Sequence, residues 1–452
     1  MERAKDYKGS VADRLERLPF SKFHRNFLLM LTSGEWAESL MLLGNGAILG
    51  LVAAYFAIGG LLSEYALPAF FFVGEFVGSI FFGRLADRRG RRTVFLYNQL
   101  LFGGGMLVAG FMPSWELVGI FVFIGGIGVG GEFPLVDSYG TEIFKGKHRG
   151  SKLAVIYTIA ATAGPFILYI SSLTRGLGFF SFRIPLWIMG IAGFTVWAIR
   201  LRLPESPRWL EMQGRYKEAD EIMKNIEERV KRDEKLSELP PVERETPIIT
   251  KKSSYAELFR GDTRRTVIMM LIFQFFQSGI FYGFVTFAPG IMIHSFRFNN
   301  PLGFGAIIFS GFVVGSIVNI FIIDKIERKW GIIGFAILGG IFGTLFVAVH
   351  TLLGAVVLGF LTTFSLWNFS NFMHQYQGEI FPTRLRTTAA GLTYSLSRIS
   401  TAILVLFIAA FIKPLGNLAI FYFIWLLVAI CVVDLIVLGP HTTRRVVEEI
   451  AQ

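Results

Sequence analysis

Long apolar runs separated by short polar breaks dominate this 452-residue chain. Most of the runs contain roughly 18 residues or more, which is enough for a helix to cross about 30 Å of hydrocarbon. A soluble fold could not bury so many of them, so we predict an all-α membrane protein with twelve transmembrane helices. The predicted spans are 25–53, 64–84, 93–112, 117–141, 151–173, 183–202, 264–291, 301–323, 331–349, 352–378, 387–412 and 417–438.

A hydrophilic stretch over 204–262 separates six predicted spans from the other six. It is rich in Glu, Lys and Arg, and 214–236 has helical periodicity without a broad apolar face. We therefore predict a linker with surface helices and not a catalytic domain. The predicted organisation is an N-terminal segment 1–24, a six-helix bundle 25–203, the linker 204–262, a second six-helix bundle 263–440 and a tail 441–452.

Composition and charge placement support the membrane prediction and orient the chain. The sequence is 53% hydrophobic and 17% charged, whereas soluble domains carry about 25% charged residues. A net charge of +11 could indicate a nucleic-acid partner, but the basic residues fall in alternate loops, as the positive-inside rule requires. We therefore expect no nucleic acid and a multi-pass protein of the cell (plasma) membrane, with both termini and the linker cytoplasmic. The single cysteine, Cys431, excludes a disulfide framework, and we expect no cleaved signal peptide.

The two halves repeat weakly in sequence. The segment after the fourth span carries Glu-Ile-Phe and a following arginine, and the same pattern returns after the tenth span. The loops after spans two and eight share an Asp and an Arg at equal spacing. The paired positions are Glu142 with Glu379, Arg149 with Arg386, Asp87 with Asp324, and Arg91 with Arg328. Repeats of this kind predict pseudo-symmetric bundles and a binding site between them, near the membrane midplane.

Three polar motifs follow the second, sixth and tenth predicted spans. They are Gly83–Arg92 (GRLADRRGRR), Leu203–Leu210 (LPESPRWL) and Glu379–Arg386 (EIFPTRLR). The first resembles the signature loop of the major facilitator superfamily. The other two resemble the motifs that sugar porters share with organic-ion and synaptic-vesicle-like transporters. The resemblance covers both halves and implies the twelve-helix fold of a secondary transporter.

The resemblance also implies a cytoplasmic charge network that latches the halves in the outward-facing state. Pairs in such a network break when the site opens inward, so they bias a two-state equilibrium. The alternative is that some of these charges only satisfy topology. The implied members are Asp87, Arg91, Glu142, Arg149, Glu205 and Arg208, mirrored by Asp324, Arg328, Glu379 and Arg386.

Other motifs help to distinguish which branch of the superfamily the chain resembles. Gly130–Pro134 (GGEFP) is similar to the fourth span of phosphate, aromatic-acid and organic-ion carriers, and Glu35–Glu38 (EWAE) resembles the Glu-Trp-Tyr-Asp pattern of metabolite–proton symporters. Proton-coupled sugar porters carry an arginine where this chain has Val122. Their paired glutamines of span seven are not reproduced, although Gln274 and Gln277 lie close by.

Ionisable side chains within the predicted spans are candidates for proton coupling. A charge at mid-bilayer costs about 2.5–3.5 kcal/mol on insertion scales, so each needs a reason. A desolvated carboxyl near another acid takes up a proton readily, which a symporter needs. The alternative is that these groups have a structural role, in which they cap unwound backbone or pair with a neighbouring helix. The candidates are Glu38, Glu132, Glu35, Asp137, Glu75 and His374.

Arg398 lies deep in span eleven and must pair with a carboxylate or face water. It could clamp a substrate carboxylate or phosphate through two parallel hydrogen bonds, and resembling organic-ion carriers hold an arginine in this region. The alternative is a structural pair with a glutamate of another helix. Further substrate-binding candidates are Gln274, Gln277, Tyr282, Asn368, Asn371, Gln375, Tyr139 and Trp36.

These features favour a proton-coupled symporter of a small organic anion, such as a carboxylate or aromatic acid, that works by alternating access. A sugar or polyol symporter, a phosphate symporter and a non-transporting nutrient sensor remain as alternatives. The sequence has no nucleotide-binding loop, metal-ligand cluster or nucleophile triad, so we expect no enzyme, cofactor or metal site. The expected partners are the small-molecule substrate, protons and lipid. We expect a monomer because one chain contains both halves of the pathway.

Overall fold

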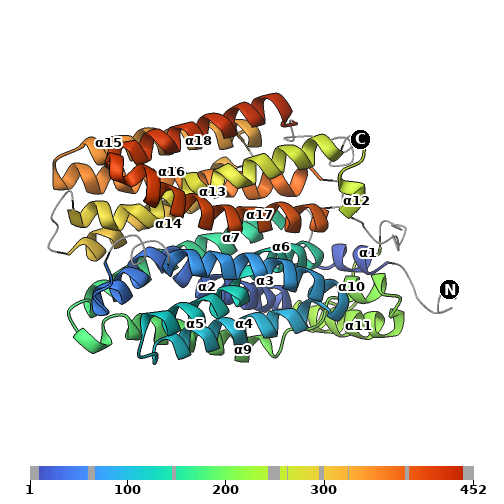
Figure 1. Cartoon of the computed structure of the whole chain (residues 1–452). Helices are drawn as coiled ribbons and strands as arrows, with labels where there is room; N and C mark the ends of the chain where they lie inside the picture. Colours follow the sequence, from blue (N-terminus) through green and yellow to red (C-terminus); the bar gives the residue numbers. More distant parts are fainter. Residues whose placement is uncertain are drawn as a thin grey trace.

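The fold is described from a computed structural model that covers residues 10–59, 67–144, 149–242, 255–261, 263–294, 300–323, 325–381 and 386–440. Twelve helical rods form two groups, one from each half of the chain (Figure 1). The first group consists of α2 (Lys22–Tyr55), α3 (Leu67–Arg89), α4 (Arg91–Ala109), α5 (Trp115–Gly130) with α6 (Glu132–Ile143), α7 (Arg149–Ala161) with α8 (Ala163–Thr174), and α9 (Arg183–Arg200), which the short η3 (Gly178–Phe180) precedes.

The second group repeats this arrangement. It consists of α13 (Thr263–His294), α14 (Pro301–Ile322), α15 (Arg328–Ala348), α16 (Leu352–Glu379), α17 (Arg386–Phe407) continued by η4 (Ile408–Ile412) and η5 (Lys413–Leu415), and α18 (Asn417–Leu438). Four short or polar helices complete the part of the chain that the structure describes: α1 (Val11–Glu16), α10 (Pro207–Met212), α11 (Tyr216–Asp233) and α12 (Tyr255–Leu258).

Ten of the described helices or helix pairs are long and apolar enough to cross a membrane. The remaining two rods are α4 and the pair α5–α6. α4 opens with Arg91 and Arg92, and α5 ends at Gly130, with only Gly131 between it and the start of α6 at Glu132. The outer faces expose large apolar side chains, which is typical of a lipid-facing surface. Examples are Phe81, Phe111, Ile191, Phe321, Leu353 and Tyr422.

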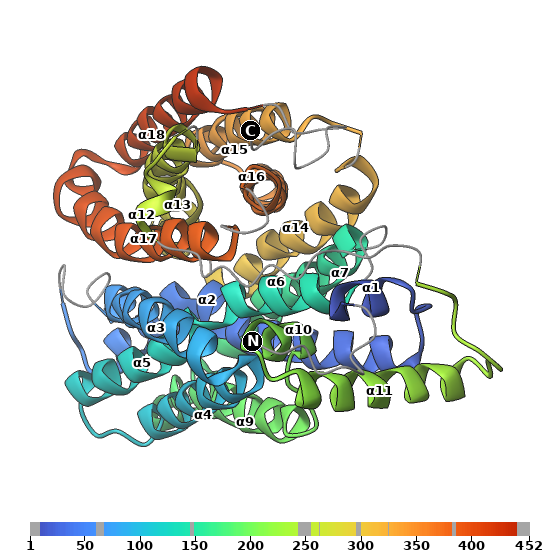
Figure 2. The same cartoon turned by 90° about the vertical axis from the view of Figure 1, so that its right-hand side faces the viewer.

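The two groups meet along a few helices near the centre of the molecule. Figure 2 looks along the bundle from its end, with α3 and α17 side by side and α7 beside α14. A hydroxyl contact of 2.9 Å between Thr158 and Ser316 joins α7 to α14. Side chains of α2, α3, α6, α7, α13, α14, α16 and α17 are therefore available to a site between the halves.

Small residues allow the helices of one half to approach closely. A Cβ atom at Gly74 of α3 would lie 3.1 Å from the Cα atom of Gly126 in α5. Membrane helices associate through such close backbone contacts, because the hydrophobic effect does not drive helices together within lipid. The backbones of α3 and α5 therefore pack directly against each other within the first half.

The end of the molecule that carries α1, α10, α11 and α12, on the right of Figure 1, is called the linker end. There α11 buries a narrow apolar stripe and forms ion pairs with α1. Arg14 lies 2.6 Å from Asp220 and 2.7 Å from Glu227, and Arg17 lies 2.8 Å from Glu227. These contacts hold α11 against the first half.

Candidate functional site

Arg398 lies on α17 between the two halves and is only 5% exposed. Its Nη1 atom donates a hydrogen bond of 2.7 Å to the hydroxyl of Tyr282 on α13, and its Nη2 atom donates to the hydroxyl of Tyr394, one turn earlier on α17. Its Nε atom has no hydrogen-bond partner among the described residues. The guanidinium is thus buried and holds neutral partners through its hydrogen bonds.

Glu75 of α3 approaches Arg398 from the opposite half. The Oε2 atom of Glu75 lies 3.7 Å from Nη1 of Arg398, and Glu75 is 1% exposed. This distance is longer than an N–H···O hydrogen bond, so the two charges attract without sharing a proton. Neither carboxyl oxygen of Glu75 has a hydrogen-bond partner in the described part of the chain. The carboxylate that pairs with Arg398 therefore belongs to another helix, which agrees with the structural alternative stated for Arg398 in the sequence analysis.

Aromatic side chains from both halves surround the guanidinium. Arg398 lies 4.3 Å from the ring centre of Tyr394 and 5.7 Å from that of Phe133 on α6. His374 on α16 stacks on Tyr157 of α7 with ring centres 5.4 Å apart, and on Phe133 at 6.4 Å. Faces of aromatic rings stabilise a cation by about 0.5–2 kcal/mol. We call Arg398, Glu75, Tyr282, Tyr394, Phe133 and His374 the central cluster.

The other buried acids among the proton-coupling candidates lie within the first half. Glu132 of α6 accepts hydrogen bonds from both Nη atoms of Arg200 at the end of α9, and both residues are fully buried. Arg200 also donates to the carbonyl of Met30 at 3.1 Å. Glu38 accepts a hydrogen bond of 2.9 Å from Gln99 on α4, and Glu35 is buried one turn before it on α2. The side chain of Asp137 lies outside the described residues.

Amide side chains form a separate chain of hydrogen bonds within the second half. Gln277 donates to Gln274 at 2.8 Å, and Gln274 donates to Gln377 at 2.7 Å. Gln377 donates in turn to Thr393 of α17 at 3.0 Å. This chain links three helices, α13, α16 and α17. It is composed of groups that also bind hydroxyls, so it is a second candidate surface for a polar ligand.

Further amides on α16 contact α14. Asn368 accepts a hydrogen bond of 3.1 Å from Asn319, and Asn371 donates to Ser316 at 3.5 Å. Gln375 lies on the same helix and is half-buried. Since Ser316 also contacts Thr158, this group reaches the boundary between the halves.

The two aromatic substrate-binding candidates Tyr139 and Trp36 make their described contacts outside the central cluster. The hydroxyl of Tyr139 donates to the carbonyl of Pro204 at 2.7 Å, and its ring packs against Phe27. The indole of Trp36 donates to Thr162 at 3.0 Å, at the break between α7 and α8. Tyr139 therefore packs beneath the 204–206 loop, whereas Trp36 braces α7 and α8.

The polar motifs of the first half interlock at the linker end. The carboxylate of Glu205 accepts from the backbone N–H of Arg91 at 2.7 Å and of Arg92 at 3.2 Å, so it caps the start of α4. Gly90 precedes this cap with a φ of 95°, and a Cβ atom there would collide with the Glu205 carboxylate. Burial raises the pKa of Glu205, although the N–H groups of Ser206, Arg92 and Arg91 act in the opposite direction.

Further contacts extend this network within each half. Ser206 donates to Glu142, which lies 3.6 Å from Arg91. In the second half Arg328 lies 3.3 Å from Glu379. Beside Glu142 at the linker end of the first half, burial lowers the pKa of Arg208. The side chains of Asp87, Arg149, Asp324 and Arg386 lie outside the described residues, so the latch between the halves stays a prediction.

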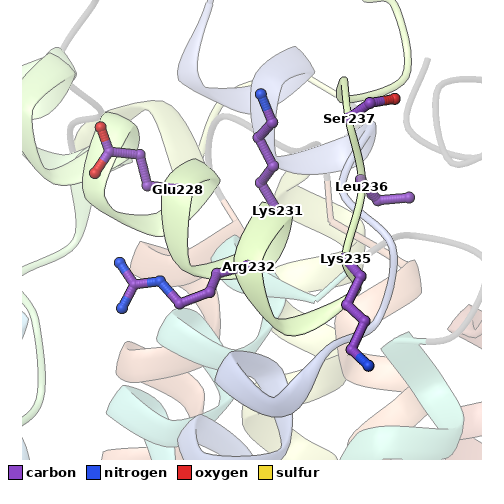
Figure 3. Close-up of a pocket in the computed structure, with 6 residues that line it drawn as sticks. All are labelled: Glu228, Lys231, Arg232, Lys235, Leu236 and Ser237. Carbon is purple, nitrogen blue, oxygen red and sulfur yellow. The ribbon is translucent and has the colours of Figure 1, made fainter.

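A hollow of about 650 Å³ at the end of α11 has a different character. Figure 3 shows that the charged ends of Lys231, Arg232 and Lys235 point in different directions. They do not converge on a common ligand, and Glu228 offsets part of their charge. This hollow lies on the linker, apart from the central cluster.

Comparison with known proteins assigns the family. Residues 62–452 match the family model described as sugar (and other) transporter. The chain belongs to this family. Its fold is that of the major facilitator superfamily: it superposes on the proton:xylose symporter XylE of Escherichia coli with a TM-score of 0.70 at 16% identity, covering 94% of this chain and 98% of XylE. The chain is therefore a multi-pass membrane transporter.

Two relatives align along almost the whole chain. The inner membrane metabolite transport protein YdjE of E. coli is 25% identical over 452 residues, covering 98% of each chain. The niacin transporter NiaP of Acinetobacter baylyi is 24% identical over 460 residues, covering 97% of this chain and 99% of NiaP. The resemblance to the major facilitator superfamily is thus confirmed, while the substrate stays open.

Several residues of the site were not predicted from the sequence. Arg200 is the partner of Glu132, and Gln99 is the partner of Glu38. Phe133, Tyr157 and Tyr394 form the aromatic surroundings of Arg398 and His374. Arg200 ends span six, where an arginine also fits the positive-inside rule, so its position alone gave no signal.

Proposed function

We propose that this transporter is a proton-coupled symporter of a small organic anion, a carboxylate or an aromatic acid, that works by alternating access. The observation that carries the proposal is the guanidinium of Arg398, buried where the two halves meet. Its hydrogen bonds go to two hydroxyls, and its counter-charge is 3.7 Å away. A substrate carboxylate that replaced the hydroxyls would bring an opposite charge and would accept two parallel hydrogen bonds from the guanidinium.

The aromatic members of the central cluster support the same substrate class. Phe133, Tyr394 and the stacked His374–Tyr157 pair provide flat surfaces next to the cation. An aromatic acid presents both a ring and a carboxylate, which match these two features. The relative NiaP is named a niacin transporter, and niacin is a carboxylic acid on an aromatic ring.

The buried acids support proton coupling, which has a defined energetic consequence. A monoanion carried with one proton is electroneutral, so the membrane potential does not drive it. Each pH unit then contributes about 1.4 kcal/mol, or a tenfold accumulation. The proton-coupling candidates remain Glu38, Glu132, Glu35, Asp137, Glu75 and His374.

The test uses purified protein in liposomes with an imposed pH gradient. Labelled nicotinate, benzoate, succinate, phosphate and xylose are offered to the wild type, Arg398→Ala and a matched control, Arg229→Ala, whose arginine is exposed on α11. We expect proton-driven carboxylate uptake that Arg398→Ala abolishes and Arg229→Ala retains. Carboxylate uptake that persists in Arg398→Ala, or uptake of xylose alone, would reject the proposal.

A sugar or polyol symporter is the second candidate, favoured by the amide chain of Gln277, Gln274 and Gln377. The family description includes sugars. In that case Arg398 would be structural and Gln274→Ala would impair uptake more than Arg398→Ala. Since a sugar is neutral, a coupled proton would make its uptake respond to voltage.

We also propose that the linker end faces the cytoplasm of a cell whose plasma membrane holds the protein, as a monomer. The alternation of basic loops supports this orientation. Cys431 is buried, so an introduced cysteine can be labelled selectively. In intact cells a membrane-impermeant maleimide should label Gly176→Cys at the opposite end and should leave Lys235→Cys unlabelled; the reverse pattern contradicts the orientation.

A further inference from the structure

Among the ion pairs that the structure describes, the pair of Glu75 and Arg398 joins the two halves of the transporter. Glu132–Arg200, Arg91–Glu142 and Arg328–Glu379 each lie within one half. A pair between α3 and α17 changes its separation when the halves move relative to each other. Its charge state is therefore linked to the conformational cycle.

We propose that Glu75 and the anionic group of the substrate compete for Arg398, and that Glu75 takes up the transported proton when the substrate displaces it. The proposal rests on the function proposed above and names the group that performs the coupling. In the state described here, the carboxylate of Glu75 compensates the charge of Arg398 in place of the substrate.

The geometry of Glu75 explains why it can be displaced. Its carboxylate makes no hydrogen bond to Arg398, whose Nη atoms donate to Tyr282 and Tyr394 instead. A substrate carboxylate that forms two hydrogen bonds with the guanidinium is a stronger partner than an acid at 3.7 Å. Substrate can thus replace Glu75 without first breaking a hydrogen bond between Glu75 and Arg398.

The surroundings of Glu75 explain why displacement requires a proton. The residue is 1% exposed, and its two oxygens have no donor among the described residues. Once Arg398 turns to the substrate, an ionised Glu75 would be a buried charge with no compensating cation, which is strongly unfavourable. A proton from water on the open side then binds to a carboxyl oxygen of Glu75. When the site opens to the other side, the substrate leaves, Glu75 again pairs with Arg398, and that proton is released there.

The remaining groups near Glu75 do not offer the same exchange. Tyr282 and Tyr394 already accept hydrogen bonds from Arg398. Glu38 interacts with Glu75 electrostatically, but its carboxylate accepts a hydrogen bond from Gln99 of the same half. Glu35 and Glu132 are further acids of α2 and α6, and Glu132 is bound by Arg200. The titratable groups of α4 and α5 lie toward the helix ends or on an outer face: Arg91, Arg92, Tyr97 and Glu116.

The experiment measures how anion affinity depends on pH between pH 6 and 8. Nicotinate serves as the probe because it stays ionised over this range, and benzoate and succinate are measured alongside. If each bound anion brings one proton to an ionised Glu75, affinity falls about tenfold for each unit of rising pH. In Glu75→Gln, the affinity should be almost independent of pH, and the pH gradient should no longer drive accumulation although exchange of labelled for unlabelled nicotinate continues.

Two further variants keep the result decisive if Glu75→Gln fails to fold. Glu75→Asp retains a carboxyl and should retain pH-dependent binding, whereas the exposed α11 variant Glu228→Gln should behave as wild type. Proton uptake that persists in Glu75→Gln, or that Glu38→Gln removes in its place, overturns the assignment but leaves the anion symporter intact. A loss of pH dependence in Glu75→Asp also contradicts it. If the wild type binds none of the three carboxylates, the proposed function fails, and this inference fails with it.

Discussion

The two buried arginine–glutamate pairs of this transporter differ in where they lie and how tightly they are held. Arg200 and Glu132 belong to one half, are fully buried and share two hydrogen bonds. Arg398 and Glu75 belong to different halves and lie 3.7 Å apart without a hydrogen bond. The first pair has the geometry of a permanent link, and the second has that of a contact that can open. Under the proposed mechanism, a functional charge is identified by its position between the two halves and not by burial alone.

The largest effect on stability is expected at Arg200. Removing one partner of a buried ion pair leaves an uncompensated charge and costs about 3–5 kcal/mol. Arg200→Ala should therefore unfold at a much lower temperature than wild type or fail to accumulate, as measured by thermal melting in detergent. Restoration of stability in the double variant Arg200→Leu with Glu132→Gln would support this reason. A single variant with wild-type melting would show that the pair is not structural.

Arg398→Ala should impair anion binding more than it impairs thermal stability. Hydrogen bonds to charged groups contribute about 1.5–3 kcal/mol, so loss of the guanidinium should weaken anion binding by about 10- to 100-fold. Melting should change less than in Arg200→Ala, because Tyr282 and Tyr394 lose one partner but Glu75 can be protonated. Binding and melting are measured on the same preparations. Equal losses in both variants would remove the distinction between the two pairs.

A smaller effect is expected at Gly90 in the linker-end network. Its φ of 95° is unfavourable for other residues, and a Cβ atom would displace the Glu205 carboxylate from the start of α4. Gly90→Ala should destabilise the fold by about 1–2 kcal/mol. Thermal melting measures the change, with Gly83→Ala as the control because that position faces open space. Equal melting of the two variants would contradict the role of Gly90.

The smallest effect is expected where α1 meets α11. Burial raises the pKa of Glu227, but hydrogen bonds from Arg14 and Arg17 outweigh it and leave the pKa below its usual range. The contribution of Glu227 is therefore present above the ordinary carboxyl pKa and is lost as pH falls through the lowered value. Glu227→Gln should cost about 0.2–1 kcal/mol at pH 7 and less at acid pH, as melting at both pH values would show. A difference that grows on acidification would contradict this sign.

The long helices were predictable because their apolar runs are long and sharply bounded. The prediction of 417–438 coincides with α18 (Asn417–Leu438), and 214–236 contains α11 (Tyr216–Asp233). The break between α7 and α8 at Thr162 was not predicted. It lies within a continuous apolar run and involves a hydrogen bond from Trp36 of another helix, which no local pattern reveals.

The candidate site was predicted in its members but not in its pairings. The sequence indicated that Arg398 must pair with a carboxylate or face water, and several intramembrane acids were possible partners. Only the packing of α3 against α17 selects Glu75, because contacts between distant segments depend on the whole fold. The same holds for Glu132, whose partner Arg200 is separated from it by one further helical rod, α7 with α8.

The central claim is that the anion is transported together with one proton, with the anion bound by Arg398 and the proton bound by Glu75. The most direct measurement is nicotinate accumulation in liposomes at a fixed pH gradient while potassium and valinomycin set the membrane potential. The account predicts accumulation that follows the pH gradient, does not change with voltage and disappears in Arg398→Ala. Xylose accumulation that rises with voltage and survives Arg398→Ala would contradict the account.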